Sequence, residues 1–207
     1  MCIDTELDKL KGWIEHLPRI GMQAIGGDGQ PMYVLDLIMI GAIKRSLSLA
    51  SGLQALVASR NMTCSRAIVR MELDTISRLL AYTYVKEPSD MATKVIGGKA
   101  LNSFKCRDGK QLRDGYLIDR MTQDYPWVKN VYKYTSGYVH FSERQVFDSI
   151  SSLGENGLRS VKFHIGSEDN NFPDESWIEI LQCFNEMLSI LEKLLVAYRN
   201  ELKQAAV

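Results

Sequence analysis

Most of the chain places hydrophobic and polar residues with the spacing of an amphipathic α-helix. Apolar residues recur at intervals of three and four, which gathers them on one face of a helix. Stretches of this kind predict helices over 4–17 (ending near Pro18), 32–60, 63–86, 89–96, 110–124, 126–147 and 174–203. The sequence therefore predicts a mainly α fold, a helical bundle with long antiparallel helices.

The pattern changes between residues 146 and 166, where Gly-Glu-Asn-Gly separates runs of β-branched and aromatic residues. Such a turn between strand-like runs favours a small β-hairpin. We expect one helical domain over 1–207. Its parts are an N-terminal helix and loop (1–30), a bundle core (31–145), a hairpin and loop insertion (146–173) and a C-terminal helix (174–207).

Composition and charge narrow the function classes. The 207 residues are 45% hydrophobic and 24% charged, and 25 basic residues balance 25 acidic ones. A nucleic-acid binder usually carries a basic surplus, so this balance disfavours that class, although RNA remains an open partner. The most apolar run, Val34 to Ile43, is ten residues long. A membrane span needs about 20, so we predict no membrane partner.

Cysteine and histidine spacing gives no sign of a metal site. The four cysteines are widely and irregularly spaced, and the three histidines lack the close pairs of zinc ligands. We therefore predict free thiols, a reducing cytoplasmic location, and neither metal nor cofactor.

The predicted helix 126–147 has two faces. One is an apolar stripe, which we interpret as core: Trp127, Val131, Tyr134, Tyr138 and Phe141. The opposite face carries Tyr132, Ser136 and His140, with Lys129 beside them. Those three polar residues predict either a solvated face or a pocket between helices. In a pocket, histidine could carry a proton, since its pKa is ordinarily near 6.5.

The predicted helix 63–86, capped by Thr63 or Ser65, also pairs a core stripe with polar residues. Val69, Leu73, Ile76 and Leu80 form the stripe. Glu72 lies about 60° from its centre and should be half-buried, so it needs a partner. Arg66 lies about 60° from the centre of the stripe as well, on the side opposite to Glu72.

Arg70, Asp74 and Arg78 continue around that helix at steps of four. We expect Asp74 and Arg78 to form an ordinary ion pair on the surface of the helix. For Arg70 and Glu72 we favour a site for an anion, a phosphate or a partner side chain, because a guanidinium fork binds such groups.

Two short motifs carry a family resemblance. Arg70-x-Glu72 in an apolar helix, followed far downstream by Ser136-x-x-x-His140, resembles an uncharacterised bacterial helical family grouped with HEPN-like proteins of defence and toxin systems. The resemblance covers about residues 40–142. It implies a helical bundle in which the Arg/Glu helix faces the Ser/His helix.

HEPN ribonucleases carry an Arg followed by His after four to six residues. In this chain only Arg159 precedes a histidine, His164, at such a spacing. That match falls in the predicted hairpin and not on a helix.

Two functions follow. The favoured one is an intracellular interaction or regulatory module, defence-associated by resemblance, that self-associates or docks on a protein partner and has a polar site between helices. The alternative is an HEPN-like RNase or toxin-type enzyme with His140 as general acid/base and Arg70 or Arg66 to stabilise a phosphate. Glu72, Tyr132 and Ser136 would orient them, and the predicted ligand-binding residues are Arg66 and Lys129. The sequence alone leaves open whether the chain is an enzyme.

Overall fold

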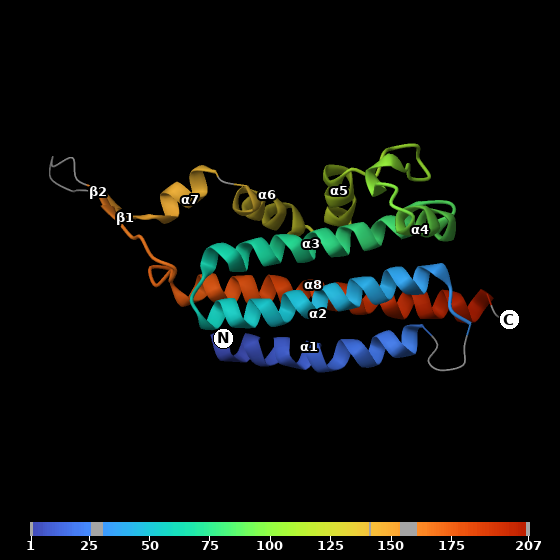
Figure 1. Cartoon of the computed structure of the whole chain (residues 1–207), viewed down its shortest axis with the longest axis horizontal. Helices are drawn as coiled ribbons and strands as arrows, with labels where there is room; N and C mark the ends of the chain where they lie inside the picture. The colour runs from blue at the N-terminus through green and yellow to red at the C-terminus, as the bar shows by residue number, and fades with distance from the viewer. Residues whose placement is uncertain (1, 26–30, 141, 154–160, 206–207) are drawn as a thin grey trace.

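The computed structural model of this chain describes residues 2–25, 31–140, 142–153 and 161–205. Figure 1 shows helices throughout and one pair of short strands. The elements are α1 (Ile3–Ala24), α2 (Val34–Ala58), α3 (Met62–Tyr84), α4 (Pro88–Ile96), the 3-10 turn η1 (Leu101–Ser103), α5 (Asp114–Asp124), α6 (Val128–Val139), α7 (Glu143–Asp148), β1 (Ile150–Leu153), β2 (Val161–Phe163) and α8 (Asp174–Ala205).

Four long helices form the central bundle, so the predicted mainly α bundle is confirmed. α1 packs against α2 and α8, and α3 packs against the same two helices. In Figure 1, α1, α3 and α8 run in one direction and α2 in the other. The antiparallel pairs are therefore those that contain α2. α8 is parallel to α3 because residues 85–173 return the chain to the end where α3 begins.

The core lies between these four helices. Its fully buried side chains come from every one of them and include Leu10, Leu17, Leu53, Leu73, Ile76, Trp177, Phe184 and Leu188. Burying one such side chain stabilises the fold by about 1.5–3 kcal/mol. On α8, the apolar spacing predicts burial of Ile178, Leu181, Leu188, Leu191, Leu195 and Ala197; the four leucines are buried, whereas Ile178 is half-buried and Ala197 is exposed. α8 instead buries Trp177, Phe184 and Met187.

A second layer covers α3 on the side away from α1 (Figure 1). It consists of α4, α5 and α6, and all three contact α3. A smaller apolar cluster, with Tyr82, Met91, Leu112 and Leu117 at its centre, joins α4 and α5 to the end of α3. This layer holds α6 beside α3, which decides the position of the polar residues discussed below.

The expected end of the first helix near Pro18 is wrong, because α1 continues to Ala24. A proline within a helix removes one hydrogen bond and costs about 3 kcal/mol. Pro18 is exposed, whereas Leu17, Gly21 and Ala24 are buried against the bundle. The packing of these residues offsets the cost.

The single helix expected over 126–147 is divided into α6 and α7. The Ser142 hydroxyl accepts from the Arg144 amide, and the Gln145 side chain accepts from the Ser142 amide at 2.8 Å. This reciprocal arrangement is a capping box, and it starts a new helix. His140 consequently lies in extended backbone just after α6.

The cap of α3 also differs from expectation. Asn61, and neither Thr63 nor Ser65, accepts the hydrogen bond from the Cys64 amide. Asp169, from the far end of the chain, accepts from the Met62 amide at 2.7 Å. Its negative charge at the start of a helix is favourable.

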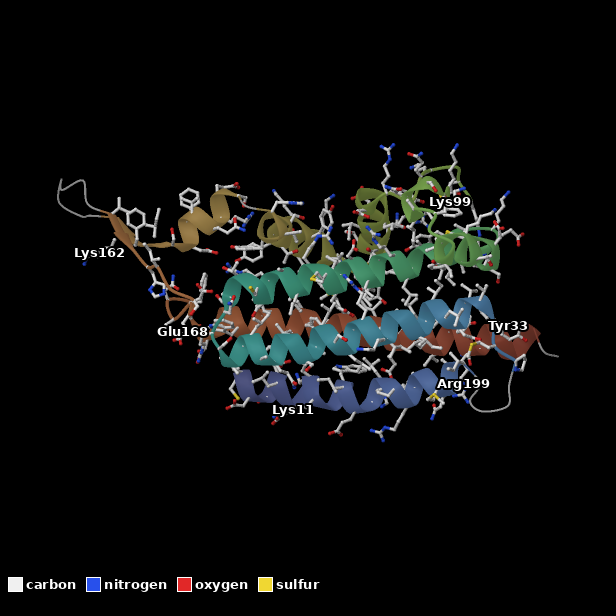
Figure 2. All side chains as sticks on the ribbon, viewed as in Figure 1. Lys11, Tyr33, Lys99, Lys162, Glu168 and Arg199 are labelled. Atoms are coloured by element: carbon white, nitrogen blue, oxygen red, sulfur yellow. The ribbon has the colours of Figure 1, made fainter. Side chains whose placement is uncertain are left out.

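α7, β1 and β2 form a projection beyond the bundle (Figure 1), and we call residues 143–153 and 161–166 the arm. The two strands lie in the segment where a hairpin was predicted, and they pair antiparallel with Ile150 opposite Phe163. Two anchors hold the arm: Arg66 binds Asp148 at 2.8 Å, and Asp169 caps α3 where the chain returns. Figure 2 shows Lys162 out on the arm and Glu168 near its return to the bundle.

Candidate functional site

Four of the predicted site residues line one groove, between α3 and α6. The groove has a volume of about 510 Å³. Its walls are Arg45 from α2; Arg70, Met71 and Asp74 from α3; Asp114 from α5; and Tyr132, Ser136, Val139 and His140 from the end of α6. The expectation that the Arg and Ser/His rows face one another therefore holds for Arg70, Tyr132, Ser136 and His140.

Arg70 is held in a defined position in this groove. Its guanidinium carbon lies 4.4 Å from the centroid of the Tyr132 ring, and its Nη1 lies 3.6 Å from an oxygen of Asp74. Such stacking of a guanidinium on an aromatic face is favourable. Asp74 is also bound by Arg78 at 2.9 Å, and Arg78 reaches Asp114 at 3.3 Å. The two acids of the groove are therefore already matched by cations.

Arg45 reaches the groove from α2. Its Nε donates to the Thr75 hydroxyl at 2.9 Å, and that hydroxyl donates to the Met71 carbonyl at 2.9 Å. This leaves the terminal amino groups of the guanidinium for other contacts.

The polar side chains that α6 contributes to the groove make fewer contacts with other helices than Arg70 and Arg45 do. The Ser136 hydroxyl donates to the Tyr132 carbonyl at 2.6 Å, which is a contact within the helix. His140 is exposed, and no hydrogen bond to its ring is found in the described part of the chain. Lys129 lies outside the groove, exposed, and pairs with Asp119 at 3.7 Å.

Glu72 is absent from the groove because it points to α2. It is fully buried, not half-buried as expected, and one carboxylate oxygen accepts from the Ser46 hydroxyl at 2.7 Å. Its other oxygen has no hydrogen-bond partner among the described residues. Burial raises the pKa of Glu72 to about 7, although the Ser46 hydrogen bond and the nearby Arg45 charge oppose this rise. Glu72 therefore cannot orient His140.

Arg66 is also outside the groove, sealed at the base of the arm. It is 4% exposed and donates to the Tyr138 hydroxyl at 2.6 Å and to Asp148 at 2.8 Å. Its guanidinium carbon lies within 5 Å of three ring centroids, those of Tyr134, Tyr138 and Phe172. Arg66 is therefore an anchor between α3, α6 and the arm.

The aromatic stripe of α6 is correspondingly only partly core. Trp127 and Val131 are half-buried and Tyr138 is buried, but Tyr134 is 40% exposed and lies against the buried Arg66 and the half-buried Arg144. Phe141 lies outside the described residues.

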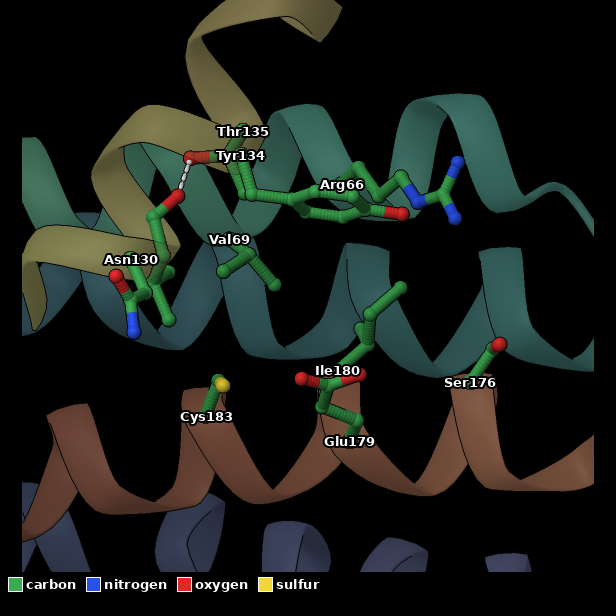
Figure 3. A pocket seen from close by; sticks show the side chains of 10 residues that line it. Arg66, Val69, Asn130, Tyr134, Thr135, Ser176, Glu179, Ile180 and Cys183 are labelled. Atoms are coloured by element: carbon green, nitrogen blue, oxygen red, sulfur yellow. Dashed lines mark hydrogen bonds between the residues drawn. The ribbon is translucent and has the colours of Figure 1, made fainter. Parts of the chain in front are cut away.

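A second, smaller cavity of about 230 Å³ lies between α3, α6 and α8 (Figure 3). Figure 3 shows the Tyr134 ring reaching along it toward Arg66, with Cys183 on the opposite wall. Val69, Val131 and Ile180 make much of its lining apolar. Burial raises the pKa of the Cys183 thiol to about 12, with Glu179 and Glu186 adding to the rise, so this thiol is unreactive.

The arm carries a set of exposed apolar residues that the sequence reasoning did not identify as a site. Exposure reaches 67% for Phe147, 60% for Phe163 and 94% for Ile165, and Val146 and Val161 are also exposed. The available signal is the alternation in Val161-Lys-Phe163-His-Ile165, which places three apolar side chains on one face of an extended segment. Arg159, which fits the HEPN spacing before His164, lies outside the described residues. The His164 ring is exposed and contacts the Glu168 carbonyl at 2.7 Å.

Among the described residues, no three histidine, cysteine or carboxylate side chains are arranged to hold a metal ion. No helix of the described segments is both long and apolar enough to cross a membrane. All four cysteines are free thiols.

Comparison of the chain with protein-family models, with curated proteins and with solved structures found no match in any of the three. The resemblance to HEPN-like proteins therefore stays a prediction.

Proposed function

We propose that this chain is an interaction module that associates with a second copy of itself through the arm. The observation that carries the proposal is the arm itself, a projection with large exposed apolar side chains. Exposed apolar surface that is contiguous commonly marks a protein–protein contact. We place the module in a reducing cytoplasm because its cysteines are free, and its role in bacterial defence rests on the family resemblance alone.

The strands of the arm favour pairing with another strand. A two-stranded hairpin is at best marginally stable alone, and each of its outer edges presents unpaired backbone groups. β1 pairs with β2, and among the described residues no further strand pairs with either. A strand added to one edge would complete those hydrogen bonds.

A second copy is the partner that fits this edge. Two identical strands can pair antiparallel about a two-fold axis, which closes the contact and limits the assembly to a dimer. With β2 at the axis, Val161 and Phe163 of both copies would share one face. Phe147 lies on α7, the helix that contacts β1, and its ring is exposed.

Molecular mass by light scattering tests the proposal. The wild-type chain should show twice its mass of 23.4 kDa. Phe147→Ser and Phe163→Ser should shift it to a monomer, since each removes an exposed ring of the arm. Ile96→Ser is the matched control, because Ile96 is 52% exposed but lies on α4. A wild-type monomer, or equal masses for all four proteins, would contradict the proposal.

The second candidate is an RNase of the HEPN-like kind, and one observation favours it: Arg70 and His140 line the same groove. It would use His140 as general acid/base and Arg70 to stabilise a phosphate. Glu72 and Arg66 take no part, since both are sealed elsewhere. The test is cleavage of cellular RNA and growth arrest on expression: both should disappear with His140→Ala, and no difference from wild type would eliminate the candidate.

A further inference from the structure

We infer that the groove between α3 and α6 binds a small phosphate monoester, with Arg45 and Arg70 holding the phosphate. Such binding requires neither the arm nor any catalytic step, because the residues that line the groove would hold the ligand on their own.

The charges of the groove favour an anion. Two fixed cations, Arg45 and Arg70, line it from two different helices. Of the two acids, Asp74 is bound by both Arg70 and Arg78, and Asp114 by Arg78. No carboxylate forms an ion pair with Arg45 within the described ranges of the chain. The lining itself carries two arginines and two carboxylates, and Arg78, from outside the lining, engages both carboxylates. Arg45 is therefore the lining cation left for an anion, and the acid that feels its charge, Glu72, is buried behind the groove.

The guanidinium groups are also set in place before any ligand arrives. Stacking on Tyr132 fixes the plane of Arg70, and the bond to Thr75 fixes the Nε of Arg45. Guanidinium forks bind phosphate oxygens in pairs, and ordering them in advance lowers the entropic cost of binding. The hydroxyl of Ser136 and the imidazole of His140, on the opposite wall, can add hydrogen bonds.

Size and apolar lining point to an ester and not to phosphate alone. A volume of about 510 Å³ falls within the range of small-molecule sites. Met71 on the α3 wall and Val139 on the α6 wall are 38% and 50% exposed. They offer apolar contact to a compact organic group beside the phosphate.

RNA is the less favoured occupant. Binding a nucleic-acid backbone draws on many phosphate contacts, and the chain has no basic surplus. Only two fixed cations line this groove, which suits a single phosphate group.

Isothermal titration calorimetry with phenyl phosphate tests the inference. Wild-type protein should bind phenyl phosphate more tightly than inorganic phosphate. Arg70→Gln and Arg45→Gln should each weaken binding by about tenfold, the effect of losing one charge-assisted contact. Arg45 is exposed, so Arg45→Gln keeps the test valid if Arg70→Gln fails to fold. The control Arg199→Gln changes an arginine of α8 whose only recorded contact in the described chain is Gln23, at 3.4 Å, and it should bind as wild type does.

Two results would overturn the inference. One is the absence of phenyl phosphate binding at millimolar concentration, or binding that Arg45→Gln and Arg199→Gln leave equally strong. The other is tighter binding of a short single-stranded RNA than of phenyl phosphate, weakened by the same two groove substitutions, since the groove would then be part of a nucleic-acid surface.

Discussion

The guanidinium of Arg70 stacks on the ring of Tyr132, with 4.4 Å between the guanidinium carbon and the ring centroid. This contact joins α3 to α6 and forms one wall of the groove. We expect the two side chains to be coupled by about 0.5–1 kcal/mol in the free energy of unfolding, the range of cation–π contacts. A double-mutant cycle with Arg70→Gln and Tyr132→Leu, followed by urea denaturation, measures this coupling. Tyr132→Phe is the control and should keep it, whereas additive effects of the two changes would show that the stack is incidental.

Glu72 should make the protein less stable as pH rises. Its pKa is about 7 in the folded chain against an ordinary 4.5, so the folded state binds more protons than the unfolded state between these values. The contribution of Glu72 to the free energy of unfolding is therefore largest below pH 4.5, and it decreases as pH rises until pH exceeds about 7. The loss is at most about 3 kcal/mol, at 1.36 kcal/mol for each pKa unit.

The test compares wild type with Glu72→Gln, which cannot ionise. As pH rises from 5 to 8, the Glu72→Gln variant should become more stable relative to the wild type, as measured by the difference in their free energies of unfolding. All other carboxylates are common to both proteins, so their titration cancels. A difference that is constant across this range, or that moves the other way, would show that the folded protein does not raise this pKa.

Removing Arg66 should destabilise the fold and release the arm. Arg66→Ala leaves Asp148 and the Tyr138 hydroxyl without their shared donor, and breaking such a buried pair costs about 3 kcal/mol. Arg66→Lys should also be destabilising, because an ammonium cannot reproduce the planar stacking. Denaturant unfolding measures both variants. The control Arg199→Ala changes a half-buried arginine of α8 that forms one side-chain hydrogen bond among the described residues, and it should change stability by less than about 0.5 kcal/mol. An equally small effect for Arg66→Ala would refute its role as anchor.

The sequence was sufficient to predict the long helices, because apolar spacing reports directly which face is buried. It located α2, α3 and α8, and it placed Leu73 and Ile76 in the core. It failed at Pro18, where tertiary packing outweighs the local cost of proline. It also failed at Ser142, whose capping box was overlooked although its Ser-x-x-Gln pattern is visible in the sequence.

The candidate site was predictable only in part, for a geometric reason. A helical pattern tells which residues share a face but not which helix that face meets. Arg70 and Glu72 are two positions apart on α3, and one meets α6 while the other meets α2. Arg66 was expected to bind a ligand, but Asp148, distant in sequence, binds it instead. The arm was missed as a surface because exposure depends on what the fold leaves uncovered.

If the arm joins two copies of the chain, a variant that lacks both strands of the arm should be a monomer. The His164 amide donates to the Ser149 carbonyl at 2.8 Å, so residues 150–163 can be replaced by a short Gly-Ser link without moving the bundle. Sedimentation equilibrium over a range of concentrations should give the mass of two chains for the wild type and of one chain for the excised variant. If the excised chain, still helical by circular dichroism, forms the same dimer, or if the wild type is a monomer at every concentration, the arm is not the site of association.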